Sequence, residues 1–173
     1  MDEAGIVRSS VPARQAAFVR QVRSSDLPAL HDLDKEVFGE FAYPLFVLRQ
    51  FMDVHSRHLL VVDADPPLRG YLLAAYAARA SDAWLLGIGV QREYRACGYG
   101  RQLLELSLDR LHADGARSVR LTVRPDNNSA IRLYESVGFR RTGFEPHYYG
   151  DGEDRFEMVA PLLDERTSWR GGL

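Results

Sequence analysis

The chain has 173 residues, a formal net charge of -2, 46% hydrophobic residues and 27% charged residues. This length suffices for one domain with a full core, and the near-neutral charge argues against nucleic-acid binding driven by bulk electrostatics. The single cysteine, Cys97, excludes an internal disulfide and any zinc site built from several cysteines. No apolar run approaches the length of a membrane span, and the N-terminus carries no hydrophobic segment of a signal peptide. We therefore expect a cytoplasmic protein without a membrane or nucleic-acid partner.

The N-terminal half of the chain predicts one strand, two helices and two further strands. Residues 1–16 show no periodicity and are interpreted as a flexible tail. Apolar residues then alternate and afterwards recur at spacings of three and four, which is typical of a strand followed by a helix. Pro44 suits the first turn of a second helix. The expected elements are a strand over 17–23, helices over 27–37 and 45–54, and strands over 59–63 and 68–77 that form a hairpin-like pair.

The C-terminal half alternates strands with helices. Gly115 is placed to close the helix before it in the left-handed conformation, and Gly138 ends the next helix. Residues 164–173 are interpreted as a frayed end. This order predicts a single α/β domain over residues 17–163, with a mixed sheet and helices on both faces. The expected elements are strands over 84–90, 118–123, 139–144 and 155–162, with helices over 102–111 and 131–137.

The connection between the strand at 84–90 and the helix after it is rich in arginine and glycine. A helix that starts at such a turn directs free backbone N–H groups and the positive end of its dipole at one point, which binds phosphate. Gly98 and Gly100 would let the backbone approach a bulky anion, and Arg95 and Arg101 add charge-assisted donors. The core of the connection reads Arg95-Ala96-Cys97-Gly98-Tyr99-Gly100-Arg101.

The spacing Arg-x-x-Gly-x-Gly differs from two common phosphate loops. A dinucleotide fingerprint needs GxGxxG and a P-loop needs Gly-Lys-Ser/Thr, and neither is present. The motif instead resembles the pyrophosphate-binding motif of the GCN5-related N-acetyltransferases, which take an acetyl group from acetyl-CoA. A second stretch supports the resemblance: residues 121–139, with Asn127, Ala130 and the run Leu133-Tyr134-Glu135-Ser136-Val137-Gly138-Phe139, look like the second cofactor motif of that family.

The resemblance covers roughly residues 18–163 and implies more than the periodicity does. It implies a mostly antiparallel central sheet whose fourth and fifth strands splay apart to form a cleft for acetyl-CoA, the cosubstrate. The pantetheine arm would pair with the backbone of the strand at 84–90. The cofactor-binding residues implied in this way are Ile88, Gly89, Val90, Arg95, Ala96, Cys97, Gly98, Tyr99, Gly100, Arg101, Asn127, Ala130 and Tyr134.

Tyr134 is the catalytic candidate. The resemblance implies that it lies near the CoA sulfur and protonates the leaving thiolate as a general acid, whereas helical spacing alone would make it a core aromatic. Asn127 contacts the pantetheine arm, caps a helix, or does both. No general base is assigned. Thr122 stands where N-terminal acetyltransferases of the family often carry Glu or His, and a hydroxyl accepts no proton unaided at neutral pH.

Two carboxylates lie near this part of the sequence, but Glu93 occupies a common turn position and neither it nor Asp82 is assigned as a base. A water chain could suffice, because an α-amine with a pKa near 8 is already partly neutral at pH 7. No metal site is expected, since His55 and His58 have no third ligand near them in the sequence.

Residues 148–158 and the aromatic loop at 38–44 resemble the ribosomal-protein alanine N-acetyltransferases, which acetylate protein N-termini. The resemblance implies direct acetyl transfer to a primary amine, such as a protein N-terminal α-amine. A small amine or antibiotic acceptor, a CoA-binding module without transfer activity, and a site for another nucleotide stay open, as do a monomer and a homodimer. The candidate acceptor-pocket residues, which could equally fill loop cores, are Phe38, Phe41, Tyr43, Tyr148 and Tyr149.

Overall fold

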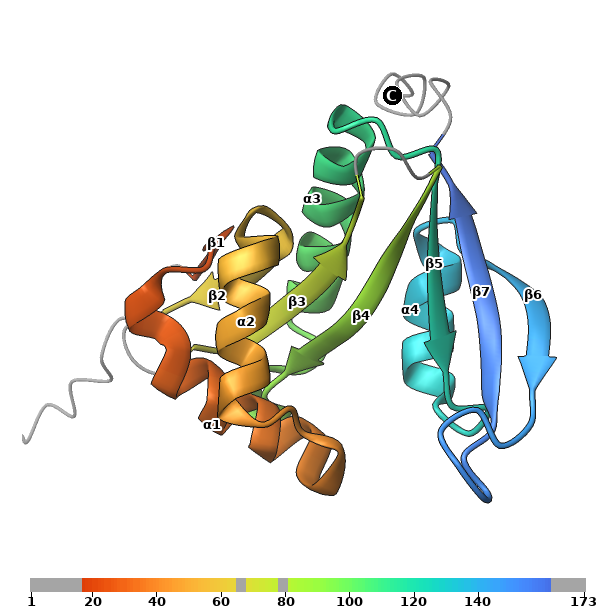
Figure 1. Cartoon of the computed structure of the whole chain (residues 1–173), viewed down its shortest axis with the longest axis horizontal. Helices are drawn as coiled ribbons and strands as arrows, with labels where there is room; N and C mark the ends of the chain where they lie inside the picture. Colours follow the sequence, from red (N-terminus) through yellow and green to blue (C-terminus); the bar gives the residue numbers. More distant parts are fainter. Residues whose placement is uncertain (1–16, 65–67, 78–80, 163–173) are drawn as a thin grey trace, which may run out of the picture.

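The computed structural model describes residues 17–64, 68–77 and 81–162, so the two tails predicted from the sequence lie outside it. Seven strands form one sheet in the order β1-β2-β3-β4-β5-β7-β6 (Figure 1). The strands are β1 (Phe18–Gln21), β2 (Leu59–Asp63), β3 (Gly70–Ala75), β4 (Asp82–Val90), β5 (Ser118–Val123), β6 (Arg140–Glu145) and β7 (Arg155–Pro161). The α-helices are α1 (Leu27–Phe38), α2 (Leu45–His55), α3 (Tyr99–Ala113) and α4 (Asn128–Ser136).

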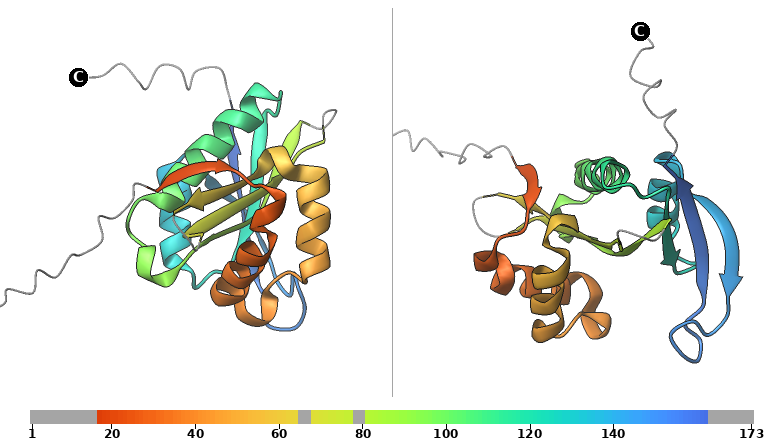
Figure 2. Two further views of the ribbon diagram at one scale, coloured as in Figure 1. Left: turned by 90° about the vertical axis from the view of Figure 1, so that its left-hand side faces the viewer. Right: turned by 45° about the horizontal axis from the view of Figure 1, so that its top comes forward.

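Helices cover both faces of the sheet, as the sequence predicts. Figure 2 shows α1 and α2 on one side of the strands and α3 on the other. The central strands β2 and β3 are almost continuously buried, which is typical of strands covered on both faces. Alternate residues of these strands belong to different hydrophobic clusters. Leu60 and Leu72 pack with residues of α3 and α4, whereas Val61 and Tyr71 pack with residues of α1 and α2.

Strands β4 and β5 separate after a short paired segment. Every other neighbouring pair in the sheet is antiparallel, but β4 and β5 are parallel and pair only at Asp82–Ser118, Ala83–Val119 and Trp84–Arg120. Beyond Trp84, β4 continues to Val90 with no strand of the described residues paired on that side. Its pairing with β3 shifts register near Leu86. Figure 1 shows the two strands meeting at one end and diverging toward the other. The splayed opening expected from the family resemblance is therefore present.

The ends of several elements differ from the sequence-based expectations. Helix α3 begins at Tyr99 rather than near 102, because Gly98 adopts the left-handed conformation (φ 86°) directly before it. Helix α4 begins at Asn128, since the Asn127 side chain caps it. Asp26, the residue before α1, makes no side-chain capping bond to the helix and forms an ion pair with Arg20 at 2.7 Å. Gly115 closes α3 with a φ of 97°, as expected.

A buried carboxylate ties α1 to the sheet. Asp34 on α1 is fully buried and accepts hydrogen bonds from the Tyr71 hydroxyl on β3 and from the backbone N–H of Tyr43. Burial raises the pKa of the Asp34 carboxyl, while these two donors act to lower it. Burial and the neighbouring Asp34 charge raise the pKa of the Tyr71 hydroxyl. The pair holds the loop before α2 against the end of α1.

We expect Tyr71→Phe to lower the free energy of unfolding by about 1–3 kcal/mol at pH 7, because it leaves a buried carboxylate short of one donor. The Asp34 pKa rises further without that bond, so the deficit is full where Asp34 is ionised and narrows as the pH falls through its pKa. Urea unfolding at pH 7 and pH 5 measures both effects. Tyr43→Phe is the matched control, since it keeps the backbone donor to Asp34. Equal stability of Tyr71→Phe and the parent chain would contradict this reading.

Candidate active site

The arginine- and glycine-rich turn presents free backbone donors at the start of α3. The first helical hydrogen bond of α3 runs from the Gln102 N–H to the Gly98 carbonyl at 3.1 Å. The N–H groups of Tyr99, Gly100 and Arg101 therefore precede the helical hydrogen-bond ladder and point out of the helix end. Together with the helix dipole, these groups form a site suited to an anion.

The two arginines of the motif hold side chains near this helix end. Arg95 Nε donates to the Val90 carbonyl at 3.3 Å, which links the turn back to the end of β4. Arg101 Nη2 donates to Ser136 Oγ at 2.8 Å, and its Nη1 lies 3.5 Å from a Glu105 carboxylate oxygen. Both arginines are exposed. Their guanidinium groups are accessible to a diphosphate bound at the turn.

The two motif glycines serve different purposes. Gly98 occupies the left-handed region, and a Cβ there would meet no atom within 4 Å, so the backbone conformation is what favours glycine. A Cβ on Gly100 would lie 3.0 Å from Leu133 Cδ2. The sequence predicts that Gly100 lets the backbone approach a bulky anion. The structure adds that its missing side chain lets α3 pack closely against α4.

The part of β4 expected to hold the donor has one unpaired side. Ile88 and Gly89 pair with β3 through Leu72 and Tyr71 on one side, while the last residue of β4 that pairs with β5 is Trp84. Backbone groups of Ile88, Gly89 and Val90 that point toward β5 therefore pair with no strand in the described part of the chain. An extended amide-bearing chain can occupy that side as an added strand does.

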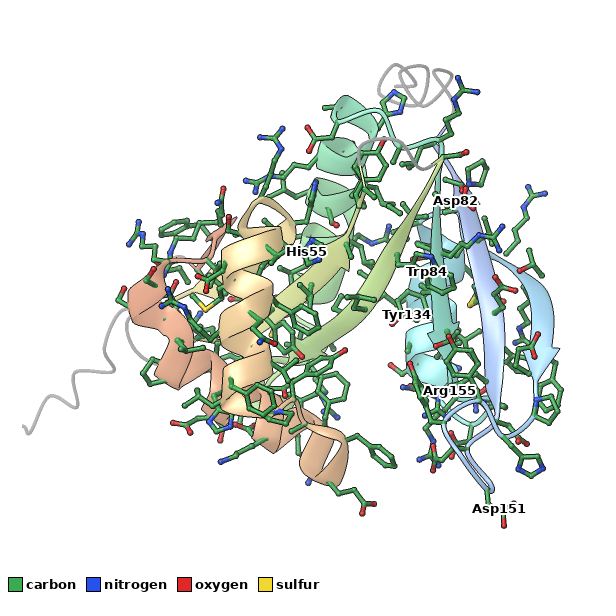
Figure 3. All side chains as sticks on the ribbon, in the orientation of Figure 1. His55, Asp82, Trp84, Tyr134, Asp151 and Arg155 are labelled. Carbon is green, nitrogen blue, oxygen red and sulfur yellow. The ribbon has the colours of Figure 1, made fainter. Side chains whose placement is uncertain are left out.

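Tyr134 lies at this opening. It projects from α4, is 6% exposed, and packs against Phe139 with ring centroids 5.7 Å apart. Figure 3 places Tyr134 between α4 and β4. Burial alone raises the pKa of its hydroxyl well above the ordinary value, so the phenol stays protonated at neutral pH. A group held in this state can donate a proton.

Asn127 caps α4. Its Oδ1 accepts the Ala130 N–H at 3.1 Å, which accounts for the start of the helix. Among the described residues no hydrogen bond uses the Asn127 amide nitrogen, so the cap leaves that donor for another partner. Cys97 is exposed and its thiol is free.

The aromatic residues predicted for the acceptor pocket divide into two groups. Phe38 packs edge-on against Tyr71 with ring centroids 6.3 Å apart, within the cluster between α1 and the sheet, so it fills the core. The Tyr43 hydroxyl lies 3.4 Å from the Leu86 carbonyl of β4. Burial, and after it the nearby Tyr149 hydroxyl, raises the pKa of Tyr43. Two loops far apart in sequence thus bring Tyr43 and Tyr149 close together.

The other two candidate pocket residues are Tyr148, which contacts Tyr149, and Phe41. The rings of Tyr148 and Tyr149 meet edge to face with centroids 4.6 Å apart, and the Arg155 guanidinium lies 4.8 Å from the Tyr149 ring centroid. Phe41 is 52% exposed. The loops that carry Tyr43, Tyr148 and Tyr149 are on the same side of the sheet. Phe41 lies between α1 and α2 and is exposed to solvent.

A charged cluster on β4, β5 and β7 was not foreseen from the sequence. Arg120 Nε contacts Asp82 Oδ2 at 2.8 Å, and its Nη1 contacts Glu157 Oε1 at 2.6 Å. Hydrogen bonds from Ser118 and then Arg120 lower the pKa of the Asp82 carboxyl. The alternation of apolar and polar residues over 118–123 predicts that Arg120 lies on the more exposed face of its strand. The sequence does not predict its contact with Glu157, because that contact depends on the pairing of β5 with β7.

No group of three or more His, Cys, Asp or Glu side chains that could hold a metal ion occurs within residues 17–64, 68–77 and 81–162. In the part of the chain that the structure describes, no helix has the length and apolar character needed to cross a membrane.

Comparison with known proteins agrees with this geometry. The model of the acetyltransferase (GNAT) family matches residues 24–139. The [ribosomal protein bS18]-alanine N-acetyltransferase of Escherichia coli (strain K12) is 40% identical over 147 residues, which are 83% of this chain and 97% of that protein. An N-alpha-acetyltransferase of Sulfurisphaera tokodaii is 28% identical over 155 residues, covering 83% of this chain and 92% of its own. The crystal structure of Ard1 from Thermoplasma volcanium aligns with a TM-score of 0.78 at 25% identity, over 86% of this chain and 99% of that one.

Proposed function

The chain belongs to the acetyltransferase (GNAT) family and is an acetyl-CoA-dependent N-acetyltransferase, and we propose that its acceptor is the α-amine at a protein N-terminus. The observation that carries the proposal is the separation of β4 from β5 beyond Trp84. The arginine- and glycine-rich turn starts α3 on one face of the sheet, and the loop of Tyr43 lies on the other face, beside α1 and α2. Donor and acceptor can therefore approach the same gap from opposite sides.

On the donor side, we assign the diphosphate of acetyl-CoA to the turn at 95–101. The free N–H groups at the start of α3 and the arginines Arg95 and Arg101 supply the donors. The pantetheine arm follows the unpaired side of β4 at Ile88, Gly89 and Val90, and the Asn127 amide nitrogen is available to it. The other residues assigned to donor contact are Ala96, Cys97, Gly98, Tyr99, Gly100 and Ala130.

The reaction is a direct transfer. A neutral amine attacks the thioester carbonyl carbon, so that a C–N bond forms while the C–S bond breaks. A backbone N–H near Val90 stabilises the oxyanion, and the Tyr134 hydroxyl gives its proton to the departing thiolate. The amide nitrogen sheds its extra proton, which returns to Tyr134 through solvent. The products are the acetylated amine and CoA thiol.

The acceptor assignment rests on the two loops and on the relatives. The relatives from Escherichia coli and Sulfurisphaera tokodaii are named for acetylation of an alanine of ribosomal protein bS18 and of α-amines. Aromatic side chains on the two loops offer apolar surface to the end of an extended peptide. Tyr43, Tyr148 and Tyr149 are the residues assigned to peptide contact. We infer a cytoplasmic location for an enzyme with such an acceptor, and a single catalytic domain over residues 17–163.

An acceptor screen tests the proposal by following release of CoA thiol. The panel pairs peptides with a free N-terminus against the same peptides with a blocked N-terminus and a free lysine, and adds spermidine and an aminoglycoside. We expect release with free N-termini and only background with blocked ones. Release with the small amines alone would overturn the proposed acceptor. Acetyl-CoA binding without release on any acceptor would contradict the transfer itself.

A further inference from the structure

We propose that Glu157 on β7 is the residue that takes up the acceptor's ammonium proton, in place of a carboxylate on β5. This inference rests on the proposed transfer to an amine. It names a residue that can accept the proton, since the Thr122 hydroxyl does not do so unaided at neutral pH. The geometry points to Glu157 through three features: the pairing of β5 with β7, the face on which Glu157 lies, and the charges that surround it.

The pairing sets Glu157 beside the opening. Thr122 is opposite Glu157 in the antiparallel β5–β7 pair, so the two side chains share one face of the sheet. Trp84–Arg120 is the last β4–β5 pair, and Thr122 is the next residue of β5 on the same face. Glu157 is therefore one strand spacing, about 4.8 Å, from the edge of the gap.

Glu157 lies on the face of the sheet from which the amine acceptor is proposed to approach. Val119, Leu121 and Val123 of β5 are buried in the cluster with α3 and α4, so Arg120 and Thr122 point to the other side. That is the side of α1 and α2 and of the loop that carries Tyr43. Burial, then the neighbouring Tyr149 and then the Glu157 charge raise the pKa of the Tyr148 hydroxyl in the β6–β7 loop.

The surrounding charges hold the carboxylate in place and leave part of it available. Oε1 accepts from Arg120 Nη1 at 2.6 Å, while Arg120 Nε binds Asp82 on β4. Within the described chain, Oε2 accepts no hydrogen bond, and the Glu157 side chain is 23% exposed.

Among the described residues, the charged and titratable groups on this face near Glu157 are Arg120 on β5, Asp82 behind it on β4, Arg155 on β7, Glu145 on β6 and Tyr148 in the β6–β7 loop. Arg155 is paired with Glu153 at 2.9 Å. The residue opposite on β6 is Gly143, which carries no charge. A Cβ on Gly143 would lie 3.4 Å from Glu157 Oε2, so this oxygen is on the β6 side of the carboxylate and the open space above Gly143 leaves it room to turn. The ammonium passes one proton to the Glu157 carboxylate, directly or through one water, and Glu157 releases it to solvent after the transfer. The amine is left with the lone pair that forms the C–N bond.

This role predicts a deficit that depends on pH. An α-amine with a pKa near 8 is about one-tenth neutral at pH 7 and about nine-tenths neutral at pH 9. Without a proton acceptor the enzyme uses only the neutral fraction. We expect Glu157→Gln to lower kcat/KM about tenfold at pH 7 and to come within about twofold of the parent at pH 9. For another amine, the pH at which the kcat/KM of Glu157→Gln approaches that of the parent chain follows the pKa of that amine.

Two variants separate this role from a structural one. Asp82→Asn also removes one carboxylate from Arg120, and we expect it to stay within about twofold of the parent at both pH values. Thr122→Glu combined with Glu157→Gln returns a carboxylate to the neighbouring strand, and we expect it to recover most of the activity at pH 7. Calorimetry should give an unchanged Kd for acetyl-CoA in all three variants, since Glu157 lies on the acceptor face.

The test uses whichever amine the acceptor screen identifies. Parent-level kcat/KM for Glu157→Gln at pH 7 would overturn the inference and leave the acetyl transfer standing. A deficit that is the same at pH 7 and pH 9 and is shared by Asp82→Asn would show that Glu157 only anchors Arg120. Absence of transfer by the parent chain to peptide N-termini would instead contradict the proposed acceptor.

Discussion

Tyr134→Phe is expected to lower kcat by about 10²–10³-fold while the Kd of acetyl-CoA stays nearly unchanged. The variant removes only the hydroxyl, so the ring still fills its place against Phe139 and among the residues of α3 and α4. What it loses is the proton for the departing thiolate. Because burial raises the pKa of this hydroxyl, Tyr134 should add no loss of activity on the alkaline side below about pH 10.

Stopped assays of kcat and KM together with calorimetry of acetyl-CoA binding check this expectation. Tyr76→Phe is a suitable control, because Tyr76 packs against the same cluster at the opposite end of β3, where its hydroxyl lies near Gly115. Unchanged turnover in Tyr134→Phe would remove Tyr134 from the chemistry. A matching loss of acetyl-CoA affinity would give it a binding role instead.

Cys97→Glu is expected to weaken acetyl-CoA binding roughly 10–100-fold relative to Cys97→Gln. Cys97 is exposed in the turn, so both longer side chains can extend into solvent with little effect on the fold. The two variants differ only in charge. A carboxylate within a few ångströms of the bound diphosphate would cost about 1.5–3 kcal/mol at an intermediate effective dielectric constant. Calorimetry on the pair isolates the electrostatic part of the effect.

Salt provides the internal control for this pair. The gap between Cys97→Glu and Cys97→Gln should narrow as the ionic strength rises, since exposed charges are screened over about 10 Å at 0.1 M salt. Equal affinity of the two variants at low salt would place the diphosphate away from the turn. A thermal unfolding scan confirms that both variants are folded.

The sequence was sufficient to predict the elements that carry the donor site. Hydrophobic periodicity gave the order of strands and helices, because both faces of the sheet are covered and each element shows its buried side. The motif from Arg95 to Arg101 lies where a strand leads into a helix, so the local sequence alone was enough to predict an anion site there. The separation of β4 from β5 was predicted from the family resemblance, because hydrophobic periodicity carries no information on how neighbouring strands diverge.

The acceptor side depends on contacts between distant segments, which the sequence does not reveal. Glu157 meets Arg120 only because β7 inserts beside β5, and that register joins residues 37 positions apart. Phe38 was predicted either to line a pocket or to fill a loop core, and in the structure it ends α1 and packs on Tyr71. Gly100 looked like a second loop glycine, whereas it lies inside α3 against Leu133.

A crystal structure of this chain with CoA tests the central claim most directly. The account predicts the diphosphate on the N–H groups at the start of α3, the pantetheine along β4 at Ile88–Val90, and the sulfur within hydrogen-bond reach of the Tyr134 hydroxyl. Electron density that placed the diphosphate away from the turn at 95–101, or the sulfur away from the gap between β4 and β5, would contradict it.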